Sequence, residues 1–424
     1  MVAGGSMGGP REDFYAGCRA LRAITNKVVF IETFGCTYNH GDSRKLSQVL
    51  KSQGCMLVDS PDRAGVVFIN SCVVIEKTAR TVMKSIGSVR SKELYITGCM
   101  PLVEPARITG IPDAMIIHPD CIHELYRDLP EVSSGSPGIV QIAKGCRGRC
   151  TYCVTRLARG DLVSFPRDEI IAEVEGNVRA GAAEIQLTAQ DASSWGADRN
   201  ETLPDLLWDL TRIDGNFRIR IGMMNPATLG PIVSGLSEVM GEEKMFRFIH
   251  MPIQSGSDRI LDLMGRGYHM QDTLAIMDAL RHDHPDISLM TDMIVGFPGE
   301  TDADFQASLS LIRNIRPNKV NITRYSARPG TKSSELSDFP DRIKKIRSRT
   351  MNAVAEDIYH DINRTWSGAV LLFIVTEKLK SGSVVTRSPS YLDIIQNEDL
   401  PIGATGMVRI TGERTYYFIG TRVL

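Results

Sequence analysis

Short β-rich runs alternate with helical stretches along most of this chain, and that alternation limits the fold more than any other sequence feature. In the first part of the sequence the β-rich runs cover residues 27–34, 66–70, 94–97 and 114–117. Strands separated by helices pair in parallel, and the helices cover the sheet that they form. The pattern predicts a doubly wound α/β domain over residues 27–132, preceded by a flexible or weakly ordered segment at residues 1–26.

The segment SSGSPG at 133–138 interrupts this pattern in the way that linkers do. The alternation then resumes with six further β-rich runs, which read IVQIA, EIQLTA, FRIRIGMM, FRFIHMPIQ, ISLMTDMIV and KVNITRYS. Six consecutive βα units predict a partial TIM-like (βα)6 barrel over residues 138–362. Such a barrel places its chemistry at the C-terminal ends of its strands.

The end of the chain, residues 363–424, has a different character. Short β-rich runs such as VLLFIVTE and GMVRITGE are separated by Gly, Ser and Asn turns. This pattern predicts a small antiparallel β-barrel. The fold class is therefore α/β, with an appended β-barrel.

Composition excludes several functional classes. The 424 residues carry 49 Lys and Arg against 50 Asp and Glu, so any RNA contact must come from local patches. No apolar run approaches the ~20 residues of a membrane helix, and the start MVAGGSMGGP lacks the apolar segment of a signal peptide. Nine cysteines in such a chain indicate a reducing compartment, where thiols serve metals or catalysis rather than disulfides. We expect a cytoplasmic protein with no membrane partner.

Cys146, Cys150 and Cys153 stand in GCRGRCTYC, a CxxxCxxC cluster directly after the first strand of the predicted barrel. A short loop can fold three such thiolates around one metal centre and leave a fourth position open. Structural zinc sites normally close with four protein ligands, and no further Cys or His follows within about fifty residues. A 4Fe-4S cluster with one iron left for substrate fits this count. A zinc knuckle completed from elsewhere in the chain is the alternative.

Cys36, Cys72 and Cys99 each follow directly on a β-rich run of the first domain, in KVVFIETFGC, VVFINSC and ELYITGC. Ligands of open α/β sheets bind outside the carboxyl ends of the strands, and neighbouring strands lie ~4.8 Å apart. The three thiolates are expected to converge and hold a second 4Fe-4S cluster with one open position. The alternative is three buried core cysteines. The remaining cysteines match no spacing and are interpreted as structural or incidental: Cys18, Cys55 and Cys121.

Beyond the six cysteines, five segments resemble the radical SAM methylthiotransferase family as they stand. They are TFGCTYNHGDS, EIQLTAQD, HMPIQSGSDRIL, TDMIVGFPGET and NITRYSARPGT, and the resemblance extends over residues 27–424. It implies an N-terminal cluster domain, a radical SAM barrel and a C-terminal TRAM domain. RIGMMNP at 220–226 and SARPGT at 326–331 are most similar to the archaeal and eukaryotic branch. That branch acts on N6-threonylcarbamoyladenosine at position 37 of tRNA, next to the anticodon.

The C–H bond at carbon 2 of adenine cannot be broken by a side-chain base at neutral pH, so a radical is required. The resemblance implies that the cluster on Cys146, Cys150 and Cys153 binds S-adenosylmethionine (SAM) and passes one electron into its sulfonium. It implies that the resulting 5′-deoxyadenosyl radical removes the hydrogen, while a methylthio group built on the other cluster is delivered to the carbon. No side chain is assigned as a catalytic acid or base. An electron donor and a sulfur source are also required.

The resemblance places the SAM contacts at strand ends of the barrel, on Gln190, Asp191, Gln254, Ser255 and the backbone of Gly296. Gly296 stands in GFPG, where glycines let the backbone approach a ligand, but GFPG is equally typical of a strand-to-helix turn capped by Thr301. Asp191 and Gln254 are also polar groups that neighbouring loops are able to satisfy. Ala189 stands where the family often has Gly.

The anticodon stem-loop of tRNA is the implied partner, contacted by the TRAM-like tail and the strip before it. DRIKKIRSRT at 341–350 carries five basic residues that suit phosphates. The alternative is the solvated face of a helix that packs Ile343 and Ile346 inward. In the tail, Arg387, Tyr416 and Tyr417 are candidates for phosphate and base contacts, although Tyr in a strand is usually a core residue.

Two other functions stay open from the sequence. Another branch of the same family modifies isopentenyladenosine in tRNA or an Asp of a ribosomal protein by the same chemistry. A different class is a non-catalytic RNA-binding protein that holds zinc at the Cys146 cluster.

Overall fold

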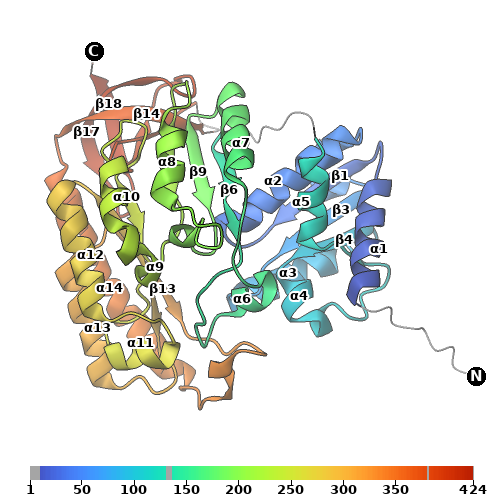
Figure 1. The fold of residues 1–424 in the computed structure, drawn as a ribbon, viewed down its shortest axis with the longest axis horizontal. Helices are drawn as coiled ribbons and strands as arrows, with labels where there is room; N and C mark the ends of the chain where they lie inside the picture. The colour runs from blue at the N-terminus through green and yellow to red at the C-terminus, as the bar shows by residue number, and fades with distance from the viewer. Residues whose placement is uncertain (1–9, 130–135, 380–381, 424) are drawn as a thin grey trace, which may run out of the picture. The chain divides into compact units, whose positions relative to one another are not determined.

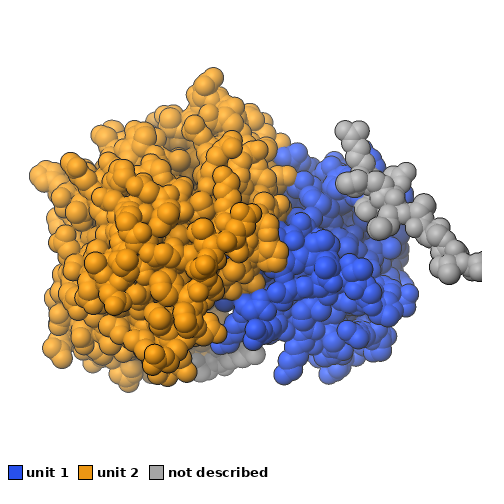
Figure 2. All heavy atoms as spheres, turned by 90° about the horizontal axis from the view of Figure 1, so that it is seen from below, with its two compact units in different colours: residues 1–134 blue, residues 135–424 orange. Residues whose placement is uncertain are grey.

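The computed structural model describes residues 10–129, 136–379 and 382–423. The chain forms two compact units, residues 1–134 and residues 135–424, which Figure 2 shows in different colours. The linker expected at 133–138 lies partly outside the described residues. The finer division of the second unit at residue 362 stays a prediction.

The first unit contains a parallel sheet of five strands in the order β2-β1-β3-β4-β5 (Figure 1). The strands are β1 (Val28–Thr33), β2 (Met56–Val58), β3 (Val66–Ser71), β4 (Glu93–Gly98) and β5 (Met115–Ile116). The helices are α1 (Pro10–Ala23), α2 (Thr37–Ser52), α3 (Glu76–Ser88), α4 (Met100–Val103) and α5 (Pro119–Arg127). Leu50 of α2 and Ile122 of α5 pack with Val29 and Phe68 of the sheet. Every residue of the central strand β3 is buried, as a doubly wound sheet requires, so this part of the fold prediction is confirmed.

The N-terminal segment differs from its prediction. The sequence predicts a flexible or weakly ordered segment at residues 1–26, whereas Pro10–Ala23 form helix α1, with Leu21 fully buried. A disulfide joins Cys18 of α1 to Cys121 of α5. The expectation that the cysteines form no disulfides is therefore wrong for these two. Packing of α1 against α5 brings together thiols that stand 103 residues apart in sequence.

The second unit begins with six parallel strands, which form two sheets of three in the orders β10-β9-β6 and β11-β12-β13. The strands are β6 (Gly138–Gln141), β9 (Glu184–Thr188), β10 (Arg218–Ile221), β11 (Phe248–His250), β12 (Ser288–Val295) and β13 (Lys319–Arg324). Parallel bridges from Ile219 to Met245 and from Met223 to His250 join the two sheets into one curved half-barrel. The partial (βα)6 barrel is thus confirmed.

The helices of this unit cover the outer face of the half-barrel. The longer ones are α7 (Arg167–Arg179), α8 (Leu203–Thr211), α12 (Met270–Asp283), α13 (Asp302–Ile315) and α14 (Asp341–Thr365). The short ones are α6 (Val154–Arg159), α9 (Pro226–Leu229), α10 (Val233–Val239) and α11 (Asp258–Met264), and a small hairpin pairs β7 (Ala143–Lys144) with β8 (Val163–Ser164). Among the described residues, no helix combines the length and apolar character needed to cross a bilayer.

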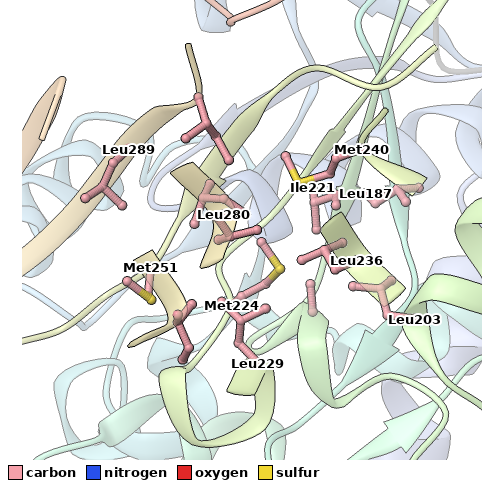
Figure 3. Close-up of a cluster of buried hydrophobic side chains, with 14 of the residues drawn as sticks. Leu187, Leu203, Ile221, Met224, Leu229, Leu236, Met240, Met251, Leu280 and Leu289 are labelled. Atoms are coloured by element: carbon pink, nitrogen blue, oxygen red, sulfur yellow. The ribbon is translucent and has the colours of Figure 1, made fainter. Parts of the chain in front are cut away.

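Side chains alternate between the two faces of each strand, and this alternation separates the core from the inner face. Leu187, Ile221 and Leu289 point outward into the apolar core beneath the helices (Figure 3). Their neighbours along the strands, such as Arg220 and Asp292, are partly exposed and lie on the inner face. The inner face is therefore polar, whereas a closed TIM barrel is filled by branched apolar side chains.

The chain ends in a closed five-stranded barrel with the strand order β14-β15-β16-β18-β17. Its strands are β14 (Val370–Lys378), β15 (Val384–Arg387), β16 (Asp393–Gln396), β17 (Thr405–Glu413) and β18 (Phe418–Val423). All neighbours are antiparallel except β16 and β18, which pair in parallel. The core of the barrel contains Phe373, Val384 and Val408. The predicted small β-barrel is confirmed.

The β15–β16 turn attaches this barrel to the base of the half-barrel. Arg387 donates through Nε to the fully buried carboxylate of Glu184 at 3.1 Å, and the Tyr391 hydroxyl donates to its other oxygen at 2.6 Å. Arg387 also pairs with Glu377 and Asp393. These buried ionic contacts hold the two parts of the second unit in one arrangement.

Candidate functional site

The CxxxCxxC loop connects β7 to α6, at the C-terminal end of the half-barrel. Two of its sulfurs flank Gly148, since a Cβ placed on this residue would lie 3.3 Å from Cys146 Sγ and 3.8 Å from Cys150 Sγ. The amide of Gly148 also donates to Cys146 Sγ at 3.2 Å. Burial, reinforced by the charge of Asp191, raises the pKa of Cys146 to about 11. Keeping these thiols deprotonated therefore requires positive charge nearby, as a metal centre supplies.

Arg266 supplies positive charge to this loop. It is 8% exposed and donates through Nη1 to Cys150 Sγ at 3.2 Å. Its other donors reach Asn225 Oδ1 at 3.1 Å and the Pro252 carbonyl at 2.8 Å. Within the described part of the chain, no carboxylate lies at ion-pair distance from this guanidinium. Asp191 and Asp292 interact with this charge only from beyond ion-pair distance, and a thiolate-bound iron-sulfur cluster would place negative charge directly beside it.

The donor set fits an iron-sulfur cluster. No three His, Cys, Asp or Glu side chains among the described residues are placed to hold a single metal ion. In a cubane cluster each thiolate binds a different iron, so the sulfurs need not meet at one point. Cys146, Cys150 and Cys153 supply three such ligands with a cation beside them.

The two polar residues after β9 orient the loops around this cluster site. The Gln190 side chain accepts a hydrogen bond from the amide of Gly145, directly before Cys146, at 2.7 Å. Asp191 accepts from the Asn225 amide at 3.0 Å and from the Thr228 hydroxyl at 2.8 Å. Burial raises the pKa of Asp191, although these hydrogen bonds oppose the rise. The Asp191 side chain is thus engaged by a neighbouring loop, which is the alternative that the sequence left open for it, and the Gln190 side chain is engaged in a similar way.

The other residues assigned to SAM by resemblance differ in whether their polar groups already have hydrogen-bond partners within the protein. Gln254 has φ +76° and is 9% exposed, and its side-chain amide has no hydrogen-bond partner among the described residues. Such backbone strain in a non-glycine residue is typical of functional sites. Ser255 is fully buried and accepts from the amide of Ser257. The Gly296 amide donates to Glu300 Oε2 at 2.7 Å, so that its N–H is already used within the turn.

The alternative interpretation of GFPG also fits the local structure. Thr301 caps α13, and Asp304 completes the capping box by accepting from the Thr301 amide at 2.8 Å. Gly296 has φ +69°, and a Cβ there would lie 2.4 Å from Lys344 Cγ. Glycine is therefore required at this position by packing against α14 as well as by its backbone conformation.

The first unit brings the three strand-end cysteines to one edge of its sheet. Cys72 and Cys99 are buried, whereas Cys36 is exposed at the start of α2. The side-chain amide of Asn39 donates to the Phe34 carbonyl at 2.9 Å and to the Ser71 carbonyl at 3.1 Å. These carbonyls stand just before the loops of Cys36 and Cys72.

Two further observations show that the cysteine loops of the first unit lie close together. Cys99 Sγ lies 4.0 Å from the Asn39 side-chain oxygen. A Cβ on Gly35, which has φ +109°, would lie 3.1 Å from Cys72 Sγ. Asn39 therefore links the loops that carry all three cysteines.

The structure revises two of the expected RNA contacts. Within the run 341–350 of α14 the buried residues are Lys344 and Arg347, whereas Ile346 is 53% exposed, so the prediction that Ile343 and Ile346 pack inward is wrong for Ile346. Arg347 turns inward because it donates to the Glu300 carbonyl at 3.0 Å and pairs with its carboxylate at 2.5 Å. The basic residues of this run that remain exposed are Arg342, Lys345 and Arg349.

In the C-terminal barrel, Arg387 is 8% exposed and bound to Glu184, which makes it a structural residue rather than a phosphate contact. Tyr416 is 61% exposed and Tyr417 40% exposed, so neither is a core residue. Lys319 lies 5.9 Å above the ring of Tyr416. This exposed aromatic and basic group is suited to stacking a base beside a phosphate.

Sequence reasoning missed Arg266, Asn225 and Asn39. Arg266 stands in MGRGY, 116 residues after the cysteine that it contacts, and no local pattern marks that pairing. Asn39 lies within TFGCTYNHGDS, three residues after Cys36, so its position beside a cysteine was the available signal. The inner face of the half-barrel also carries a polar group made of His250, Asp292 and Asn321. A carboxylate oxygen of Asp292 lies 2.8 Å from His250 Nε2, and the other accepts a hydrogen bond from the Asn321 amide at 2.7 Å.

Comparison with protein families gives two matches. Residues 140–312 match the radical SAM superfamily, and residues 28–117 match "Uncharacterized protein family UPF0004". The first range contains the CxxxCxxC loop and Arg266, and the second contains the three strand-end cysteines.

Curated relatives match the chain over nearly its full length. A probable threonylcarbamoyladenosine tRNA methylthiotransferase of Methanothermobacter thermautotrophicus is 35% identical, with 92% of this chain and 98% of the relative covered. One of the same description from Pyrococcus abyssi is 36% identical, with 90% and 95% covered. A tRNA-2-methylthio-N(6)-dimethylallyladenosine synthase of Zymomonas mobilis is 31% identical, with 91% and 94% covered.

Among solved structures, the fold resembles the radical S-adenosylmethionine methyltransferase TsrM from Kitasatospora setae, with a TM-score of 0.54. The two chains are 13% identical over 73% of this chain and 77% of the other. At this identity the likeness concerns the fold alone.

Proposed function

This chain belongs to the radical SAM methylthiotransferase family, and we propose that it converts N6-threonylcarbamoyladenosine at position 37 of tRNA to its 2-methylthio derivative. The proposal depends on one observation above all. The loop that carries three thiols at the C-terminal end of the half-barrel is contacted, through Cys150, by the buried guanidinium of Arg266, which has no carboxylate at ion-pair distance among the described residues. That charge arrangement suits an anionic iron-sulfur cluster with one position left for SAM. The substrate follows from the relatives named for threonylcarbamoyladenosine, at 35% and 36% identity.

The radical SAM site would be held by Cys146, Cys150 and Cys153. When bound there, a 4Fe-4S cluster and SAM supply the one-electron chemistry that breaks the unactivated C–H bond at carbon 2 of the adenine. The protein's own side chains would position the cysteine loop and neutralise negative charge at its sulfurs. Arg266 donates to a ligand sulfur, and Gln190 holds the loop just before Cys146.

Around this site the chain also provides ligand-binding groups. Asp191 and its hydrogen bond to the Asn225 amide set the loop after β10. Gln254 is the SAM-contact candidate with an unused side chain, since its amide has no partner among the described residues. The other assigned residues, Ser255 and Gly296, would then shape the pocket through the turns that they stabilise.

We infer that Cys36, Cys72 and Cys99 would hold a second 4Fe-4S cluster, which when bound would supply the sulfur chemistry of the methylthio transfer. The inference is supported by their placement at one edge of a parallel sheet and by Asn39, which ties their loops together. Two clusters of this kind correspond to about eight irons per chain.

The anticodon stem-loop is the proposed RNA partner, and cytoplasmic tRNA the proposed substrate pool. Tyr416, Tyr417 and Lys319 are the exposed groups best suited to contact it. An electron donor and a sulfur source complete the reaction as separate partners.

Mass spectrometry of tRNA nucleosides from a deletion strain tests the proposed function. We expect 2-methylthio-threonylcarbamoyladenosine to disappear and the unmethylthiolated nucleoside to accumulate. Loss of the 2-methylthio form of isopentenyladenosine instead would assign the chain to the other tRNA branch. Unchanged tRNA nucleosides would refute both assignments.

A further inference from the structure

Arg220 carries a positive charge on the inner face of the half-barrel, and no acidic side chain in the described part of the chain forms an ion pair with it. Its guanidinium lies 5.1 Å from the ring centre of Phe248 and 5.8 Å from that of Tyr391. Within the described residues it has neither a hydrogen bond nor an ion pair. The strand places it inward, because its neighbours Ile219 and Ile221 are both in the outer core.

The acidic group near the base of the same face is already occupied. Glu184 accepts from Arg387, from the Tyr391 hydroxyl and from Gln186, whose amide lies at 2.7 Å. Arg218, two residues before Arg220 on the same strand, donates to Glu243 at 2.9 Å. Arg218 and Arg220 are alternate residues of one strand, and among the described residues Arg218 has a carboxylate partner whereas Arg220 has none.

A guanidinium that lies against two neighbouring aromatic rings, with no anion bound to it among the described residues, is prepared for a planar, bidentate acceptor. The ring contacts fix its position, so little conformational entropy is lost when a carboxylate binds. The face around it offers further polar partners in the His250–Asp292–Asn321 group. The inner face is therefore suited to a charged, polar substituent rather than to an apolar one.

We propose that Arg220 binds the carboxylate of the substrate's N6 substituent and so selects a threonylcarbamoyl group over an apolar isopentenyl group. This inference rests on the proposed function, because the threonylcarbamoyl arm carries a free carboxylate and the isopentenyl arm carries none. An isopentenyl group in the same place would leave the guanidinium unpaired and partly desolvated, which costs affinity. SAM also has a carboxylate, and the test must separate the two sources.

The test compares two synthetic anticodon stem-loops with the full-length reconstituted enzyme. One carries threonylcarbamoyladenosine, and the other carries its neutral threonine-amide analogue. The variants are Arg220→Gln and Arg220→Lys, with Arg218→Gln as the matched control on the same strand. For each protein we would measure the Kd of both stem-loops, the Kd of SAM, and the formation of methylthiolated product.

For wild type and Arg218→Gln we expect the carboxylate stem-loop to bind about 10- to 100-fold more tightly than the amide. Arg220→Gln should lose this preference while its SAM affinity stays unchanged, and Arg220→Lys should keep part of it. A preserved preference in Arg220→Gln would overturn the proposal. A weakened SAM affinity with the preference retained would instead assign Arg220 to the SAM carboxylate and equally overturn it. Failure of wild type to modify either stem-loop would count against the proposed function itself.

Discussion

The guanidinium of Arg266 lies 3.2 Å from the sulfur of Cys150, so that a fully engaged, buried cation contacts one of the three loop thiols directly. The same side chain is fixed by Asn225 and by the Pro252 carbonyl. The positive charge of Arg266 is therefore held at a fixed position beside the cluster that the three thiols would bind.

Replacing Arg266 by Gln should lower the reduction potential of the bound cluster. The positive charge favours the more negative, reduced state, and a hydrogen bond to a charged group is worth about 1.5–3 kcal/mol. For one electron this corresponds to a shift of about 60–130 mV. Redox titration followed by EPR measures it, in a Cys36, Cys72 and Cys99 to Ala background that leaves one cluster. Arg212→Gln, at a side chain 75% exposed, is the control and should show no shift.

Replacing Cys36, Cys72 and Cys99 together by Ala should halve the iron content, from about eight to about four per chain. Cleavage of SAM should continue, because the other three cysteines are untouched. Methylthiolation of tRNA should stop. Iron analysis, 5′-deoxyadenosine formation and nucleoside mass spectrometry check the three expectations, and continued tRNA modification would refute the role given to the first unit.

Asn39→Leu should reduce iron binding in the first unit although every cysteine is present. The substitution removes the hydrogen bonds from Asn39 to the carbonyls of Phe34 and Ser71. The Ser71 carbonyl keeps the Cys99 amide as a donor at 2.9 Å, whereas the partly buried Phe34 carbonyl loses the Asn39 donor, at a cost of about 1–3 kcal/mol. Ser52→Ala is the matched control, since it removes one hydrogen bond at the far end of the same helix. Equal iron content in both variants would show that Asn39 does not organise these loops.

Arg387→Met should destabilise the second unit by about 3–5 kcal/mol, because Glu184 would remain fully buried without its cation. The midpoint of urea unfolding of the apoprotein reports the loss. Lys378→Ala breaks the exposed pair with Asp399 and should cost at most about 1 kcal/mol. A similar effect of the two substitutions would argue against the anchoring role of Arg387.

Asp304→Asn should remove an acid-sensitive contribution to stability. Burial alone would raise the pKa of Asp304, but hydrogen bonds from Arg259, Ser257 and Thr301 outweigh it and hold the pKa below 3.8. The stabilisation is present above pH 3.8 and is lost as the pH falls toward the lower folded pKa. The variant should lose about 1 kcal/mol at neutral pH, and the difference from wild type should shrink below pH 3.8. Unfolding measured from pH 3 to pH 7 tests this, with Asp361→Asn as an exposed control.

The elements of the fold were readable from the sequence because each is recorded in neighbouring residues. The run EIQLT became β9 (Glu184–Thr188), and KVNITR became β13 (Lys319–Arg324), since their composition and their helical flanks fix both strand type and parallel pairing. The CxxxCxxC site was also local, because Cys146, Cys150 and Cys153 share one short loop. The α1 helix was missed because its start lies within a Gly-rich segment.

What the sequence by itself determined was the order of strands and helices, and the places where thiols stand relative to them. Only the tertiary structure decided which distant groups meet: Arg266 with Cys150, Cys18 with Cys121, and Arg347 with Glu300. The physical reason is that periodicity and spacing are properties of a few consecutive residues. The partner of a buried charge, in contrast, is set by how whole elements pack, and the unpaired charge of Arg220 became visible only after every other partner had been placed.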